Sequence, residues 1–149
     1  MGSIPTSTTK NYLLMKNIKV LFNNVELRVY ENGDIWTSDR YITQWNGHIY
    51  QSRFIKAKKL TPTCNGKAGY YQVKVYFEGK GKAIYVHRLV WMAFNGDIPE
   101  GYEIDHLDED KANNSLSNIA LKTRKENMDK MLASNPHLIY NLKQFKTVK

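Results

Sequence analysis

Apolar and polar residues alternate over much of the first half of the chain, as in strands that bury one face. Residues 26–30 and 34–37 flank a hairpin turn in which we expect positive φ at Asn32 and Gly33. Turn sequences rich in Gly and Asn separate three further expected strands, at residues 53–59, 70–77 and 83–87. The pattern therefore predicts an N-terminal half that is mostly antiparallel sheet.

The period changes after residue 87. Leu89, Val90, Ala93 and Phe94 fall on one face of a helix, which we expect over residues 88–94, and Gly96 follows where a C-terminal cap belongs. Two short strands are then expected at residues 102–107 and 118–122, around a polar loop. A helix is therefore expected between the N-terminal sheet and a β-loop-β unit.

A capping box follows the second of these strands. Thr123 is expected as the N-cap and Glu126 as the third helical residue of a helix that runs to about residue 133. Asn127 lies in the first turns of that helix, where its side chain can point toward Asp105 and His106 at the end of the preceding strand. The β-loop-β-helix order therefore predicts that polar groups distant in sequence converge.

The charge balance narrows the class of partner. The 149 residues hold 22 Lys and Arg against 14 Asp and Glu, a formal charge of +8 with a pI near 9.5. A nucleic acid is the first expectation and an acidic membrane surface the second, although many basic proteins bind nothing anionic in particular. Strands such as Gln72-Val73-Lys74-Val75-Tyr76 can place lysine on one face and apolar residues on the other, as a DNA-facing or a merely solvated sheet would.

Cysteine content and hydropathy indicate the cellular compartment. Cys64 is the single cysteine, which rules out an intramolecular disulfide and a thiolate zinc site, and no apolar run approaches the length of a membrane span. We therefore expect no membrane partner and a cytoplasmic location. Residues 1–16 read as a flexible lead-in, and the myristoylation-like start at Gly2 is too short a motif to outweigh this.

The second half carries a more specific pattern. Several segments stand here in a fixed order: Val86-His87-Arg88-Leu89-Val90, Ile104-Asp105-His106-Leu107-Asp108, Asp110-Lys111, Asn113-Asn114, Asn118 and Glu126-Asn127. Together they resemble the HNH homing endonucleases of phage introns over residues 85–127. The resemblance implies an α+β fold with a β-rich DNA-binding part at 17–83, a ββα-metal nuclease unit at 84–133 and a short basic tail at 134–149. It also implies a phage-infected bacterial host as the setting.

The same resemblance assigns roles to the residues of the unit. Asp105 and Asn127 are expected to hold one divalent cation, Mg²⁺ or Mn²⁺, while His106 activates the attacking water and Asn118 fixes the loop that carries His106. The motif's usual final histidine is Asn127 here. Oxygen ligands of this kind suit Mg²⁺, which keeps several waters and binds through one or two protein groups. His87 is a motif position for which we expect support of the active-site loop or a phosphate contact rather than proton transfer.

The expected substrate is double-stranded DNA, cut to 5′-phosphate and 3′-hydroxyl ends by a monomer that nicks or by a homodimer that cuts both strands. Five basic residues are expected to contact its phosphates: Arg88, Lys111, Lys122, Arg124 and Lys125. Each site residue taken singly could be an ordinary cap, turn or surface residue. Two rival functions remain open on sequence alone, a catalytically inactive nucleic-acid-binding module and a non-specific nuclease.

Overall fold

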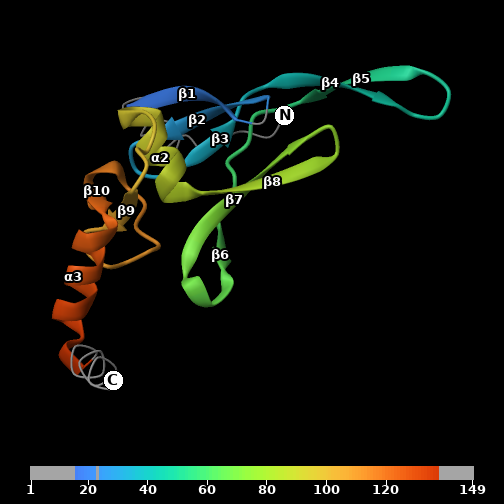
Figure 1. Ribbon diagram of the computed structural model, residues 1–149. Coiled ribbons are helices and arrows are strands. Elements are labelled where there is room, and N and C mark those ends of the chain that lie inside the picture. Colours follow the sequence, from blue (N-terminus) through green and yellow to red (C-terminus); the bar gives the residue numbers. More distant parts are fainter. Residues whose placement is uncertain (1–15, 23, 138–149) are drawn as a thin grey trace.

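A computed structural model describes residues 16–22 and 24–137 and has the expected α+β architecture with antiparallel strands (Figure 1). Residues 1–15 and 138–149, which include nearly all of the predicted lead-in and most of the predicted tail, lie outside the described residues. Within the described part, no helix is long and apolar enough to cross a membrane. In chain order the elements are β1 (Asn17–Phe22), β2 (Val25–Tyr30), β3 (Ile35–Thr37), β4 (Arg40–Trp45), β5 (Tyr50–Ile55), β6 (Thr63–Asn65), η1 (Gly66–Ala68), β7 (Tyr70–Phe77), β8 (Lys80–Tyr85), α2 (Val86–Asn95), β9 (Tyr102–His106), η2 (Leu116–Asn118), β10 (Ile119–Thr123) and α3 (Arg124–Ser134).

The core lies where the sheet β1-β2-β3 and strand β7 meet helix α2. Alternate residues of β2 are buried, as the sequence pattern predicts for a strand with one covered face. Leu89 and Val90 of α2 are buried in the same cluster. The fully buried apolar side chains are Val25, Leu27, Val29, Ile35, Val73, Val75, Val86 and Val90. Burial of these side chains fixes α2, and α2 in turn leads the chain into β9.

Strands β4 and β5 form a two-stranded arm that extends away from the rest of the molecule (Figure 1). The prediction of a strand at residues 53–59 is wrong here, because β5 ends at Ile55 and its partner β4 was not predicted. Nearly every side chain of the arm is exposed, so neither strand carries the buried-and-exposed alternation from which strands are predicted. Cross-strand ring pairs, such as Tyr41 with Phe54 at 5.2 Å between centroids, line one face instead.

Three local predictions are also corrected by the structure. His87, expected at the end of a strand, lies in the first turn of α2, because β8 ends at Tyr85 and Val86 is already helical. Asn118, expected to begin a strand, ends the short 3-10 turn η2 and is buried. In the turn between β2 and β3 only Gly33 has positive φ, at 91°, since the Asn32 side chain instead accepts a hydrogen bond from the Asp34 backbone N–H.

The helix start at Thr123 is confirmed. The Thr123 side chain accepts a hydrogen bond from the Glu126 backbone N–H, and the Glu126 carboxylate accepts one from the Thr123 backbone N–H, which completes the capping box. Helix α3 follows β10 without a loop and packs on the β9-β10 hairpin. This geometry brings the first turns of α3 beside the end of β9.

Candidate active site

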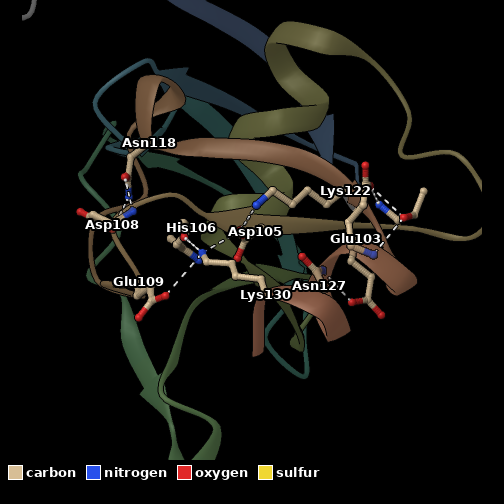
Figure 2. A network of polar contacts seen from close by, with 11 residues as sticks. Glu103, Asp105, His106, Asp108, Glu109, Asn118, Lys122, Asn127 and Lys130 are labelled. Atoms are coloured by element: carbon tan, nitrogen blue, oxygen red, sulfur yellow. Dashed lines mark hydrogen bonds and ion pairs between the residues drawn. The ribbon is translucent and has the colours of Figure 1, made fainter. Parts of the chain in front are cut away.

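The register of the β9-β10 hairpin sets the positions of the site residues. Asp105 pairs with Ala120 and His106 with Ile119, so both lie at the end of β9 where the polar loop 107–118 begins. Asn127 and Lys130 stand three residues apart on α3 and therefore share one face of the helix. Figure 2 shows both side chains directed toward β9, where Lys130 meets Asp105 and Asn127 meets Glu103.

Asp105 is held between two ammonium groups. Its Oδ2 atom accepts hydrogen bonds from Lys122 Nζ at 2.8 Å and from Lys130 Nζ at 2.9 Å (Figure 2). Partial burial acts to raise the pKa of Asp105, but the two lysines outweigh it and keep this pKa below its ordinary value. Asp105 is therefore a carboxylate at neutral pH, with its negative charge available to a cation.

Asn127 presents an acceptor that the described residues leave unused. Its Nδ2 donates to Glu103 Oε2 at 3.1 Å, whereas its Oδ1 is buried without a hydrogen-bond partner in the described part of the chain. A buried amide oxygen without a partner costs free energy, and a bound cation would relieve that cost. Residues 16–22 and 24–137 contain no group of three His, Cys, Asp or Glu arranged for a metal. The donor set thus fits a cation that takes few protein ligands, as Mg²⁺ does.

His106 is buried and is oriented by the loop that follows it. Its Nε2 lies 3.1 Å from Asn114 Oδ1, and the Asn114 Nδ2 donates to the backbone oxygens of Lys111 and Ala112, which identifies Oδ1 as the atom that faces the imidazole. An amide oxygen only accepts hydrogen bonds, so Nε2 must carry the proton. In the neutral ring Nδ1 then holds the lone pair that can accept a proton.

Asn118 clamps the two ends of the polar loop. Its Nδ2 donates to Asp108 Oδ1 and to the Asn113 backbone oxygen, both at 2.8 Å, and its Oδ1 accepts from the Asp108 backbone N–H at 3.2 Å. The β2-β3 turn supports the same loop, because the Leu116 N–H donates to the Glu31 backbone oxygen at 2.7 Å. Asn118 thus holds the loop that orients His106 and makes no contact with His106 among the interactions of the described residues.

A cleft of about 630 Å³ lies between β7, η1 and the β9-α3 unit. Lys111 crosses its edge, with Nζ donating to the Ala68 backbone oxygen at 2.8 Å and lying 4.3 Å from the centroid of the Tyr70 ring. The cleft is lined by six predicted site residues, His87, Arg88, Asp105, His106, Lys111 and Asn127, together with Tyr70 and Lys130. Asn118, Lys122, Arg124 and Lys125 do not line it. Asp105, His106 and Asn127 therefore line one and the same cleft.

The five predicted phosphate-contacting residues fall into two groups. Arg88, Arg124 and Lys125 are exposed, and Arg88 also lines the cleft. Lys111 bridges to Ala68, and Lys122 pairs with Asp105, so both ammonium groups already have partners within the chain. The structure leaves the first group more available to an external anion.

Lys130 is a site residue that the sequence analysis missed. Besides Asp105, its Nζ contacts the His106 backbone oxygen at 3.1 Å and Glu109 Oε1 at 3.8 Å. Its spacing of three residues from Asn127 is the signal that could have identified it, because residues three apart share a helix face. Asn114, expected only as a turn residue, is the second omission.

His87 lies beneath the site and contacts it by its ring. Its imidazole meets His106 edge-on at 5.2 Å between centroids, and Tyr85 stacks on it at 5.6 Å. Nδ1 of His87 is buried and has no hydrogen-bond partner among the described residues. Burial, with smaller contributions from His106 and Arg88, lowers the pKa of His87 from 6.5 to about 4, so its ring is neutral at neutral pH.

The lowered pKa of His87 predicts a stability loss in acid. Between pH 6.5 and pH 4 the unfolded chain binds the proton that the folded chain excludes, so stability is full above pH 6.5 and falls as the pH drops toward 4. Between pH 7 and pH 4.5 this contribution is roughly 2 to 3 kcal/mol. Urea unfolding measures the free energy of unfolding at pH 7 and at pH 4.5. The loss of this free energy between the two pH values should be smaller in His87→Phe than in wild type by about that amount. An equal pH dependence in wild type and variant would contradict the assignment.

Comparison with known proteins finds a family match for the segment that carries this arrangement. Residues 84–129 match the family model described as HNH endonuclease. The chain is 31% identical to DNA endonuclease I-HmuI of Bacillus phage SP01 over 103 residues, which are 69% of this chain and 58% of that protein. It is 33% identical to H-N-H endonuclease F-TflII of Escherichia phage T5 over 102 residues, 66% of this chain and 51% of that protein.

A solved structure agrees with the sequence comparisons. The structure described as DNA binding and cleavage by the HNH homing endonuclease I-HmuI superposes with a TM-score of 0.53 at 27% identity, covering 79% of this chain and 62% of that one. The matched part of the chain thus spans 58% of the length of I-HmuI and 51% of the length of F-TflII. The matched residues 84–129 contain the hairpin, the loop and the start of the helix that carry Asp105, His106, Asn118 and Asn127. Residues 84–129 therefore carry a match to the HNH endonuclease family, in a chain that is similar to phage HNH endonucleases beyond this domain as well.

Proposed function

We propose that the chain is a metal-dependent endonuclease that hydrolyses phosphodiester bonds of double-stranded DNA to 5′-phosphate and 3′-hydroxyl ends. One observation carries the proposal: a carboxylate, a buried amide oxygen without a partner and an oriented imidazole line the same cleft, on Asp105, Asn127 and His106. A lone cap or turn residue needs none of these neighbours, whereas hydrolysis assisted by a metal and a general base can use all three groups together.

Asp105 and Asn127 are the residues that would hold the cation. Carboxylate and amide oxygens suit both Mg²⁺ and Mn²⁺, and the acceptor left unused on Asn127 is explained by such a ligand. When bound, the cation supplies Lewis-acid stabilisation of charge on the phosphate and on the departing 3′-oxygen. Lys122 and Lys130 keep the Asp105 carboxylate in place and ionised before a cation arrives.

His106 acts as the general base in this proposal. Asn114 holds Nε2–H, so the Nδ1 lone pair accepts a proton from water as the water oxygen bonds to phosphorus and the bond to the 3′-oxygen breaks. Asn118 acts at a distance by holding the loop from Asp108 to Asn113, and with it the position of Asn114. His87 packs under the imidazole and, being neutral, adds no charge beside the base.

The distribution of charge along the chain supports DNA as the substrate. Residues 53–88 hold nine Lys and Arg and one acidic residue, Glu78, whereas residues 100–110 hold six Asp and Glu and no Lys or Arg. The basic segment suits the phosphate backbone, and the acidic segment around Asp105 suits a divalent cation. The DNA endonucleases named among the relatives act on the same polymer.

The exposed basic residues at the start of α3 predict salt-dependent DNA affinity. Replacing Arg124 and Lys125 together by Gln removes two cations that release counterions on binding, so the slope of log affinity against log salt should decrease in magnitude by about 1 to 2. Titration of a labelled duplex at several salt concentrations measures this slope. Lys16→Gln, which removes an exposed lysine outside residues 17–83, is the control and should leave the slope unchanged. An unaltered slope in the double variant would exclude these residues from the interface.

Product ends and fragment patterns test the reaction itself. We expect DNA ligase to reseal nicks made by the protein without any other treatment, because ligase joins 5′-phosphate to 3′-hydroxyl ends. Nicks that ligase cannot seal would contradict the proposed chemistry. On a long linear DNA, discrete fragments would support a homing-type enzyme with a defined site, and a smear would overturn that part of the proposal in favour of a non-specific nuclease.

A further inference from the structure

Lys130 occupies a position between the two halves of the proposed site. Its Nζ lies 2.9 Å from Asp105 Oδ2 and 3.1 Å from the backbone oxygen of His106, and its side chain lines the cleft (Figure 2). The ammonium group thus touches the proposed cation ligand on one side and the residue of the proposed base on the other. No other ammonium group in the described part of the chain joins these two residues in the same way.

Lys122 offers a comparison within the same chain. It reaches the same Asp105 oxygen at 2.8 Å, and its side chain is 27% exposed against 28% for Lys130. Lys122 comes from β10 and does not line the cleft, whereas Lys130 comes from α3 and does. The two lysines therefore neutralise Asp105 alike, but only Lys130 faces the space that a substrate would enter.

The contacts of Asp105 with two lysines suit the protein without a bound cation. One carboxylate oxygen balances two ammonium groups here, and a divalent cation on Asp105 would bring two more positive charges against them. A long lysine side chain at a cleft has the freedom to move its ammonium group to another anion nearby. In the cleft, the anion next to His106 would be the phosphate that is attacked.

We propose that Lys130 is a catalytic residue, which transfers its ammonium contact from Asp105 to a non-bridging oxygen of the scissile phosphate when a divalent cation binds Asp105. The inference rests on the proposed nuclease function. The Lys130 ammonium group donates N–H hydrogen bonds to the phosphate and offsets the charge that builds up on it during attack. Lys122 stays behind the site as a structural partner of the carboxylate.

The test separates cation binding from cleavage. Mn²⁺ affinity is measured by electron paramagnetic resonance without DNA, and single-turnover cleavage of supercoiled plasmid is measured at saturating protein and Mg²⁺. Lys130→Gln and Lys122→Gln should each bind Mn²⁺ about two- to fivefold more tightly, because each removes one competing charge. Lys130→Gln should slow cleavage by about 10²-fold, as loss of one transition-state donor does, and at least tenfold more than Lys122→Gln. Lys130→Arg, which keeps the charge, should recover part of the rate.

Thermal unfolding of each variant without metal controls for the fold, and Lys16→Gln, at an exposed lysine outside residues 17–83, serves as a surface control in every assay. Equal cleavage rates for Lys130→Gln and Lys122→Gln would overturn the catalytic role and leave Lys130 a counter-ion of Asp105. Weaker Mn²⁺ binding by Lys130→Gln would overturn the competition on which the transfer depends. If wild type binds Mn²⁺ but cuts no DNA, the proposed nuclease function itself fails; if wild type cuts and Lys130→Gln cuts equally, only the role of Lys130 fails.

Discussion

His106→Ala is expected to lower the single-turnover rate of plasmid cleavage by about 10²- to 10⁴-fold, the usual contribution of a general base. In the proposed mechanism the substitution removes the Nδ1 lone pair that accepts the proton of the attacking water, and we expect no second imidazole to replace it. His87 is the nearest alternative, and its ring lies beneath His106 with a pKa lowered to about 4 by burial, which makes it a poor base. Plasmid affinity should be unchanged.

His48→Ala is the matched control for this prediction. His48 is exposed in the turn of the β4-β5 arm, far from the cleft in sequence and structure, and its loss should leave the single-turnover rate unchanged. A His106→Ala protein that is folded by thermal unfolding and cuts at the wild-type rate would exclude His106 as the base. A matching loss of DNA affinity would instead indicate that His106 serves binding.

Asp105→Asn is expected to abolish detectable metal-dependent cleavage, with a rate loss of at least about 10²-fold. The substitution keeps the size of the side chain and removes the negative charge that attracts a divalent cation. Mn²⁺ affinity measured by electron paramagnetic resonance should therefore fall together with the rate. The variant also leaves Lys122 and Lys130 without their shared counter-charge, so a lower melting temperature is expected as well.

Asp97→Asn provides the matched carboxylate control, because Asp97 is exposed between α2 and β9 and does not line the cleft. The control should bind Mn²⁺ and cut plasmid as wild type does. Retention of Mn²⁺ binding and cleavage in Asp105→Asn would show that the cation is held elsewhere. Raising the Mg²⁺ concentration should restore little of the lost rate, since Asn127 alone provides one neutral protein ligand.

Local sequence signals predicted the elements that are stabilised by their own caps or by the burial of one face. The capping box at Thr123, the strand at residues 70–77 and the helix that ends before Gly96 all occur, because caps and buried faces leave a mark on neighbouring residues. The strands of the β4-β5 arm were not predicted correctly, for the opposite reason. Its strands are exposed on both faces and pair with each other, so no alternation of apolar and polar residues in the sequence indicates β4 or the end of β5.

The candidate site was predicted from spacing and family resemblance, and its supporting contacts were not. The hairpin register and the capping box together bring Asn127 toward β9, as the β-loop-β-helix order implied. The pairing of Lys122 and Lys130 on Asp105 depends on the packing of α3 against β9, which involves residues up to 25 apart. The hydrogen bond from His106 to Asn114 likewise depends on the folded shape of the loop. Neither contact follows from residue type alone.

Conversion of supercoiled plasmid is the measurement that tests the central claim most directly. Wild-type protein is incubated with Mg²⁺ or Mn²⁺, with and without EDTA, beside His106→Ala, and nicked, linear and smeared products are quantified separately. We predict nicked or linear DNA from wild type only when the metal is free, and no conversion by His106→Ala. Binding of plasmid by both proteins without conversion under any condition would contradict the account and indicate a nucleic-acid-binding module that keeps the HNH fold.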